Sequence, residues 1–104
     1  MARLTPETKV KNAIIAYCNE QYDKGVPLLC FRRDSASINY RRGLPDMYVV
    51  YGSNHIEVET KKPEGGELSI DQIKWRDRFL KMGTPYLVAR SLQEFRDFLS
   101  HISL

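Results

Sequence analysis

Long apolar segments are missing from this sequence of 104 residues. No apolar run approaches the roughly 20 residues of a membrane-spanning helix, and the first residues lack the apolar stretch of a secretion signal. Cysteine is scarce, since only Cys18 and Cys30 occur and they lack the close pairing of a zinc motif. We therefore expect an intracellular protein without a membrane partner, in which the two thiols are packed side chains rather than a disulfide.

Motifs for several common cofactors are also missing. His55 and His101 are far apart and belong to no HExxH pattern, which argues against a zinc centre. The pair Gly65-Gly66 lacks the lysine and the spacing of a phosphate-binding loop, so we expect no nucleotide cofactor. The sequence has no repeat, low-complexity tract or linker, and its length suits one compact domain over residues 1–104.

The net charge of +3 is small and does not by itself indicate a nucleic-acid-binding protein. The distribution of charge is more informative. Residues 32–42 contain four arginines and one acid, residues 57–71 contain five acids and two lysines, and residues 72–81 contain four basic residues and one acid. An acidic segment between two basic ones suits a metal site that acts on a polyanion, because acids bind the cation and basic residues bind phosphates. Solvated surface charge is the simpler alternative.

Periodicity and capping residues predict the element order αβββαβα. Thr5 is a good N-cap, and Ser69-x-x-Gln72 and Ser91-x-x-Glu94 are capping boxes. A hairpin followed by a strand reached through a helix implies an α/β fold with a mixed four-stranded sheet flanked by helices. The expected elements are a helix from Pro6 to a stop at Gly25, a strand over 28–33, a loop over 35–39, hairpin strands over 47–51 and 55–60, a helix from Ser69 to Met82, a strand over 86–89 and a last helix from Ser91 with an apolar stripe to Ile102.

The hairpin gathers the residues best suited to chemistry. Alternation along its second strand puts Glu57, Glu59 and Lys61 on one face. Antiparallel pairing brings Asp46, at the start of the first strand, close to Glu59 and Lys61. Two carboxylates and a backbone carbonyl form a hard-oxygen pocket for Mg²⁺ or Mn²⁺, and a water acidified by such an ion attacks a phosphodiester. Lys61 is placed to orient that water or to stabilise charge on the phosphate.

The same segment resembles a nuclease motif. Pro45-Asp46, followed after 12 residues by Glu59-Thr60-Lys61, is similar to the motif of the PD-(D/E)XK nucleases. The surrounding sequence is more specific. Gly43-Leu-Pro-Asp46, Pro63 after the second hairpin strand, and the helix start Leu68-Ser-Ile-Asp-Gln72 with Trp75 resemble the VRR-NUC (virus-type replication-repair nuclease) subfamily. The likeness covers about residues 40–90, with a looser match in the first helix.

This resemblance implies a restriction-endonuclease-like fold, with an αβββαβ core and an added C-terminal helix, and DNA cleavage with Mg²⁺ or Mn²⁺. It also implies a homodimer that cuts branched DNA such as Holliday junctions, in the cytoplasm of a bacterial or phage-infected cell. The metal ligands that it implies are Asp46, Glu59, the Thr60 carbonyl and, by rough position only, Glu7. It implies Lys61 as the catalytic lysine and Gln72 as a supporting site residue.

Basic side chains around the acidic segment are expected to contact DNA phosphates. The residues concerned are Arg32, Arg33, Arg41, Arg42, Lys62 and Lys74. A two-fold dimer supplies two sites for the two cuts that a junction needs. The candidate interfaces are the exposed edge of the hairpin and the apolar stripe of the last helix, with Phe95, Phe98 and Ile102.

Two alternatives concern the function and the ligand register. In a motif register shifted by two residues, Glu57 would be the metal ligand and Glu59 would take the position of the lysine. We favour Glu59 as the ligand, because Glu59-Thr60-Lys61 then keeps a lysine at that position. A non-catalytic nucleic-acid-binding module on the same fold is the alternative to an enzyme. Such a module would gain nothing from placing Asp46, Glu59 and Lys61 at one strand edge. A protein that only recruits partners would need an exposed apolar stripe, and the helical stripes here are needed for the core.

Further alternatives concern individual site residues. Glu7 is equally well explained as a first-turn acid that the helix dipole favours. Gln72 is equally well explained as the capping-box partner of Ser69, and one amide is not expected to fill both roles. Trp75 and Phe79 are expected in the core rather than on a DNA-stacking surface.

Overall fold

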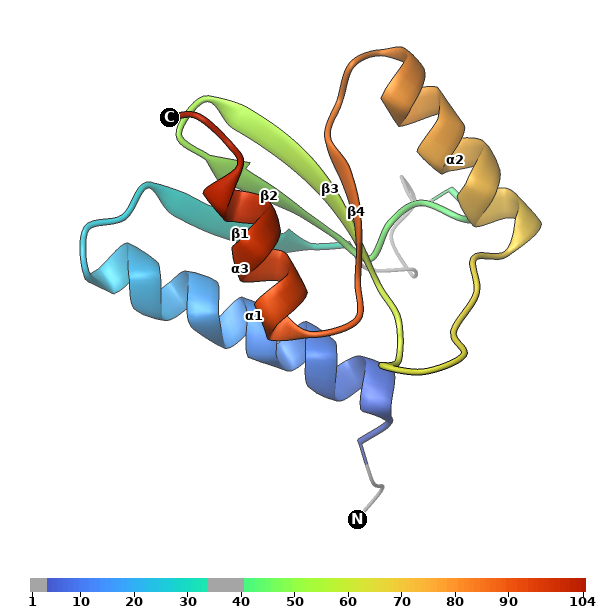
Figure 1. Cartoon of the computed structure of the whole chain (residues 1–104), viewed down its shortest axis with the longest axis horizontal. Coiled ribbons are helices and arrows are strands. Elements are labelled where there is room, and N and C mark those ends of the chain that lie inside the picture. Colours follow the sequence, from blue (N-terminus) through green and yellow to red (C-terminus); the bar gives the residue numbers. More distant parts are fainter. Residues whose placement is uncertain (1–3, 34–40) are drawn as a thin grey trace.

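The computed structural model of the chain describes residues 4–33 and 41–104. Within these ranges the predicted order of helices and strands is confirmed (Figure 1). The elements are α1 (Pro6–Asp23), β1 (Leu28–Arg32), β2 (Met47–Tyr51), β3 (Asn54–Thr60), α2 (Ile70–Lys81), β4 (Tyr86–Ala89) and α3 (Leu92–Ser100). The loop expected over 35–39 lies outside the described residues.

The strands form one mixed sheet in the order β1-β2-β3-β4, as the sequence predicts. The first three strands are antiparallel neighbours, and β4 pairs with β3 in parallel after the α2 crossover. The hairpin turn is shorter than expected, because β3 already begins at Asn54. Gly52 takes the first turn position with a φ of 60°, a left-handed conformation that suits glycine in a tight two-residue hairpin.

The hydrophobic core lies between one face of the sheet and the helices α1 and α3. Side-chain alternation on the strands sends every second residue toward these helices. Ile14 of α1, Val49 and Val58 of the sheet, and Phe95 of α3 are fully buried together. The other members of the core cluster are Val10, Cys18, Leu28, Met47, Ile56, Ala89 and Leu99. Cys18 and Cys30 are both free thiols.

Helix α2 stands apart from this core, and in Figure 1 the strand β4 lies between α2 and the other two helices. It has no buried residue. The expectation that Trp75 and Phe79 belong to the core is therefore wrong. Both are half-buried, and their rings contact each other at 5.9 Å between centroids. The indole N–H of Trp75 donates to the carbonyl of Arg42 at 2.9 Å, which ties α2 to the segment before β2.

Both predicted dimer interfaces are taken up by the fold itself. Phe95 is fully buried, and Phe98 and Ile102 pack against the core, because α3 shields the apolar face of the sheet beside β4. The hairpin of β2 and β3 has no free edge, since β1 pairs with one side and β4 with the other. None of the described helices is long and apolar enough to cross a membrane.

Candidate metal centre

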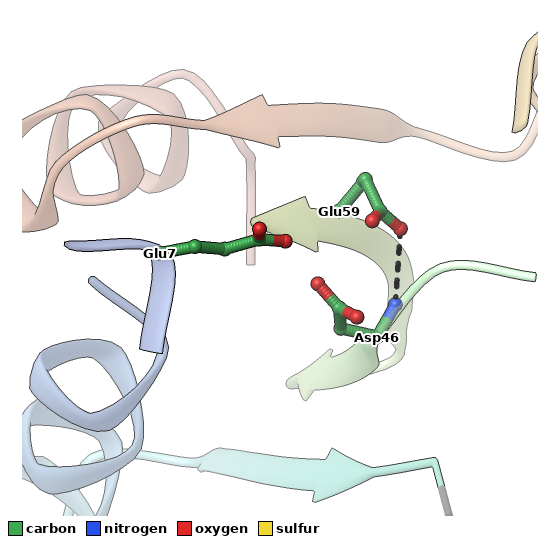
Figure 2. Close-up of side chains that lie close together, drawn as sticks. All are labelled: Glu7, Asp46 and Glu59. Atoms are coloured by element: carbon green, nitrogen blue, oxygen red, sulfur yellow. Dashed lines mark hydrogen bonds between the residues drawn. The ribbon is translucent and has the colours of Figure 1, made fainter. Parts of the chain in front are cut away.

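Three carboxylates converge at one end of the sheet. Glu7, Asp46 and Glu59 each offer one oxygen, and these oxygens lie within 4.8 Å of one another. Figure 2 shows the three side chains pointing toward one another from the first turn of α1, the residue before β2 and the end of β3. Carboxylate oxygens are hard donors of the kind that Mg²⁺ and Mn²⁺ prefer. The donor set therefore suits such an ion.

The hairpin register places Asp46 and Glu59 side by side. Met47 pairs with Val58, so Asp46 lies across from Glu59, as predicted from the spacing. The Asp46 N–H donates to Glu59 Oε2 at 3.2 Å (Figure 2). Asp46 Oδ2 accepts hydrogen bonds from the Thr60 N–H at 3.0 Å and the Thr60 hydroxyl at 2.6 Å. These bonds fix the Asp46 carboxylate. The carbonyl of Thr60 as a ligand stays a prediction.

Glu7 and Lys11 reach the site from α1. Glu7 lies in the first turn, where the helix dipole favours a negative charge. A role as a first-turn acid and a role as a metal ligand are therefore compatible. Lys11 lies one turn later, and its Nζ is 3.6 Å from Asp46 Oδ1. Lys11 was not predicted from the sequence. Its spacing of four residues from Glu7 was the available signal, because residues i and i+4 share one face of a helix.

Gln72 makes both of the contacts that were not expected from one amide, one to the cap of α2 and one to Glu59. Its Oε1 accepts the Ser69 N–H at 2.8 Å and completes the capping box of α2. Its Nε2 donates to Glu59 Oε1 at 3.0 Å. The expectation was wrong because the acceptor and donor atoms of one carboxamide point in different directions and bind separate partners.

The glycine of the segment before Asp46 brings α2 close to the site. Gly43 has a φ of 88°, and a Cβ atom at this position would lie 2.5 Å from the backbone carbon of Asp71. Only glycine fits both the left-handed backbone and this close approach. The first turn of α2, which carries Gln72, therefore packs directly on the segment that leads into Asp46.

Glu59 is buried, with only 1% of its surface exposed. Burial, and next the charge of Asp46, raise the pKa of Glu59 to about 8, while the charge of Lys61 opposes this rise. The metal-free site consequently holds a proton near neutral pH. A divalent cation in the site would favour the carboxylate form, because opposite charge lowers the pKa of an acid.

Tyr86 reaches the same face of the sheet from β4. It pairs with Glu57 in the parallel register, so its side chain lies on the face that carries Glu57 and Glu59. Its hydroxyl is buried and has no hydrogen-bond partner among the residues that the structure describes. Burial, and next the charge of Glu59, raise the pKa of the Tyr86 hydroxyl. Tyr86 was not predicted as a residue of this site, because its placement depends on which strand β4 joins.

Glu57 belongs to a separate cluster. It is 1% exposed, and Arg33 binds both of its oxygens, with Arg33 Nη2 2.9 Å from Oε2. His55 Nε2 lies 2.5 Å from the same Oε2. Arg33 also donates from Nη1 to the Pro45 carbonyl at 3.1 Å and from its N–H to the Asp46 carbonyl at 2.8 Å. The side-chain partners of Glu57 are therefore Arg33 and His55, outside the cluster of Glu7, Asp46 and Glu59. Arg33 also holds the backbone of the Pro45-Asp46 turn.

The remaining predicted DNA contacts lie at the surface. The exposed members of this set are Arg32, Arg41, Arg42, Lys62 and Lys74. The Arg42 guanidinium lies 3.8 Å from Asp71 Oδ2 at the start of α2. Lys61 follows β3 directly and is half-buried, and its N–H donates to the Ala89 carbonyl at 3.0 Å.

No protein-family model and no curated protein matches the sequence. Solved structures do match the fold. One, described as "VRR_NUC domain", has a TM-score of 0.71 and 25% identity over 96% of this chain and 100% of that chain. Another, described as "VRR_NUC domain protein", has a TM-score of 0.72 and 14% identity over 95% of this chain and 88% of that chain.

These likenesses define the chain as a module with a nuclease-type fold. They confirm the α/β architecture that the sequence predicts, and they support its resemblance to VRR-NUC domains.

Proposed function

We propose that the chain is a divalent-metal-dependent DNA endonuclease that hydrolyses phosphodiester bonds. The observation that carries this proposal is the convergence of Glu7, Asp46 and Glu59, with one oxygen of each within 4.8 Å of the others, on a nuclease-type fold. Charge supports it, since three ionised carboxylates at this distance repel one another, and a cation between them would relieve that repulsion and release the proton that Glu59 otherwise holds.

Asp46, Glu59, Glu7 and the Thr60 carbonyl are the proposed ligands of Mg²⁺ or Mn²⁺. Such an ion supplies Lewis acidity, which turns water into a nucleophile and offsets phosphate charge. The protein holds the ligands in advance, because Thr60 fixes the Asp46 carboxylate and Gln72 fixes Glu59. Partners that orient metal ligands in this way typically raise metal affinity.

Two lysines border this centre. Lys61 is the proposed catalytic lysine, and its ammonium orients the attacking water or stabilises charge on the phosphate. Lys11 offsets part of the repulsion among the acids, because its Nζ lies 3.6 Å from Asp46 Oδ1. Both lysines contribute positive charge where a phosphodiester must approach three carboxylates.

We propose branched DNA, such as a Holliday junction, as the substrate and a homodimer as the working unit. The exposed residues Arg32, Arg41, Arg42, Lys62 and Lys74 are the proposed phosphate contacts. Arg33 is more strongly engaged within the chain, because Glu57 binds its guanidinium. Two copies related by two-fold symmetry would present two sites to the opposing strands of a junction.

A cleavage assay tests the proposal. The chain is incubated with single-stranded, duplex, flap and four-way-junction DNA, in Mg²⁺, in Mn²⁺ and in EDTA. We expect cleavage of the branched DNAs in either metal and none in EDTA. Full activity in EDTA would contradict the metal requirement, and absence of cleavage in both metals would favour a binding module. Light scattering that shows a monomer, together with equal cleavage of junction and duplex, would leave a simple nicking nuclease.

A further inference from the structure

Three aromatic rings stack across the sheet on the face opposite α1 and α3. Phe31 of β1 and Tyr48 of β2 are register partners, and their ring centroids are 4.9 Å apart with an angle of 14° between the planes. Tyr48 stacks in turn on His55 of β3, at 5.0 Å and 15°. We call these three side chains the ring array. None of them belongs to the hydrophobic core cluster.

The ring array is continuous with the metal centre. Arg33 lies over the Tyr48 ring at 5.0 Å and also donates to the carbonyl of Pro45, the residue before Asp46. Tyr48 is the register partner of Glu57, which lies on the same face of β3 as Glu59. From strand spacing and rise, the Cα atoms of Phe31 and Glu59 are about 12 Å apart. A nucleic acid strand whose phosphate lies at the metal centre therefore has a base within reach of Phe31.

Phe31 ends the array with an accessible ring. It is 39% exposed, although one ring face packs on Tyr48. Nucleobases stack on exposed aromatic rings of this kind, and a guanidinium over a ring of the same array adds cation–π attraction. Arg33 provides that guanidinium, and the Glu57 carboxylate fixes its position.

A second copy of the chain fits this face less well. Within the described part of β1, the large apolar side chains exposed on this face are Leu29, at 43%, and Phe31. Two partly exposed side chains are a small apolar centre for a stable protein interface, which buries roughly 800 Å² per partner. A dimer contact also does not explain why the rings are stacked face to face beside the Arg33 guanidinium.

We infer that Phe31, at the end of the ring array, is a stacking site for an unpaired nucleobase of the DNA strand that enters the metal centre. This inference rests on the proposed nuclease function and narrows its substrates to DNA that offers an unpaired base next to the cut. The ring array extends the base stack into the sheet, and Arg33 links the stacking site to the turn that positions Asp46.

Three variants test the stacking site in the full chain. Phe31→Ala removes the side chain, Phe31→Leu keeps its apolar character without a ring, and Phe31→Trp keeps a ring. Tyr22→Ala is the matched control, because Tyr22 is 56% exposed and lies near the far end of α1, about 22 Å along the helix from Glu7. Binding is measured by fluorescence anisotropy with a labelled short oligothymidylate and a labelled duplex, both in EDTA, so that cleavage does not interfere.

We expect Phe31→Ala and Phe31→Leu to lose about 5-fold to 150-fold in affinity for the oligothymidylate, which is the usual effect of removing one base-stacking ring. Phe31→Trp and Tyr22→Ala should bind it like the unmodified chain, and duplex affinity should be unchanged in all four. Circular dichroism checks the folding of each variant, and Phe31→Leu decides the outcome if Phe31→Ala does not fold.

Unchanged oligothymidylate affinity in Phe31→Leu would overturn the inference. A second outcome would also overturn it. If light scattering shows that Phe31→Ala is a monomer while Phe31→Leu remains a dimer, the face is a protein interface. The two proposals fail separately. Phe31-dependent binding without cleavage of any DNA in Mg²⁺ or Mn²⁺ would refute the nuclease function and leave the stacking site intact. Cleavage with unchanged affinity in Phe31→Leu would refute only the stacking site.

Discussion

Gln72 binds Glu59 through one atom of its side-chain amide while the other atom caps the helix on which it sits. These two bonds join the start of α2 to the end of β3. Helix α2 has no buried residue, so its position depends on such polar contacts more than on packing. The orientation of Glu59 and the start of α2 are therefore coupled through one side chain.

The two roles of Gln72 can be separated by substitution. Gln72→Glu keeps an oxygen to accept the Ser69 N–H but loses the donor to Glu59 and adds a negative charge beside it. We expect stability close to that of the unmodified chain and metal affinity about 10-fold to 100-fold lower. Gln72→Ala should lose both, with about 1 kcal/mol of unfolding free energy lost from the cap. Urea denaturation and Mn²⁺ calorimetry measure the two effects, and equal metal affinity in Gln72→Glu would contradict the coupling.

Asp46→Asn and Glu59→Gln should each abolish cleavage and Mn²⁺ binding, because each removes a charged ligand from the centre. Both proteins should still bind DNA. Glu67→Gln is a suitable control, since Glu67 is an exposed acid outside the cluster and its loss should leave metal binding unchanged. Calorimetry in which Asp46→Asn binds Mn²⁺ as tightly as the control would remove Asp46 from the ligand set.

Lys61→Ala should reduce the cleavage rate and leave Mn²⁺ affinity unchanged or raised. The lysine is assigned to the water and the phosphate rather than to the metal. Lys62→Ala is the matched control, because Lys62 is exposed and should affect DNA binding only. Loss of Mn²⁺ binding in Lys61→Ala would show that its assigned role is wrong.

Glu57→Gln should destabilise the protein rather than impair the chemistry. It leaves the Arg33 guanidinium without its buried counter-charge, at a cost of about 2–3 kcal/mol of unfolding free energy. The folded fraction should keep its Mn²⁺ affinity. Glu64→Gln changes an exposed acid and serves as the control in urea denaturation. If Glu57→Gln loses Mn²⁺ binding and Glu59→Gln keeps it, the ligand register is shifted by two residues.

The stability of the metal-free protein should fall as the pH rises. Folding raises the pKa of Glu59 from 4.5 to about 8, so the folded state binds the proton more tightly than the unfolded state. This contribution is fully present below pH 4.5 and is lost as the pH rises to about 8, with a slope of at most about 1.4 kcal/mol per pH unit. Urea denaturation across this range measures the slope, and Glu59→Gln should remove it. Equal slopes in both proteins would contradict the assignment.

Local patterns in the sequence were enough to predict the elements and the position of Asp46 beside Glu59. Caps such as Ser69 and strand alternation act within a few residues, so they can be read directly. Asp46 and Glu59 belong to one hairpin, and its register alone brings them together. Because these patterns act only between residues close in sequence, they predicted the helix α2 but not the surface on which it packs. Trp75 and Phe79 form an apolar pair, yet nothing in their spacing says which surface they cover.

Contacts between distant elements could not be predicted. Lys11 and Arg33 reach the Pro45-Asp46 turn only after α1 and β1 have packed against the hairpin. Tyr86 lies on the sheet face that carries Glu59 only because β4 joins the sheet beside β3. The apolar stripe of α3 was predicted both to serve the core and to be a candidate dimer interface, because its spacing does not show what covers it. In the structure it packs on the face of the four-stranded sheet.

The cluster of Glu7, Asp46 and Glu59 joins two parts of the chain that differ in local stability. Two of its members lie in a hairpin, whereas Glu7 lies in the first turn of a helix, where fraying costs little free energy. A cation held by all three stabilises only those conformations in which the first turn is docked. Such an ion would join the first turn of α1 to the sheet, and the amide hydrogens of that turn would exchange more slowly in its presence.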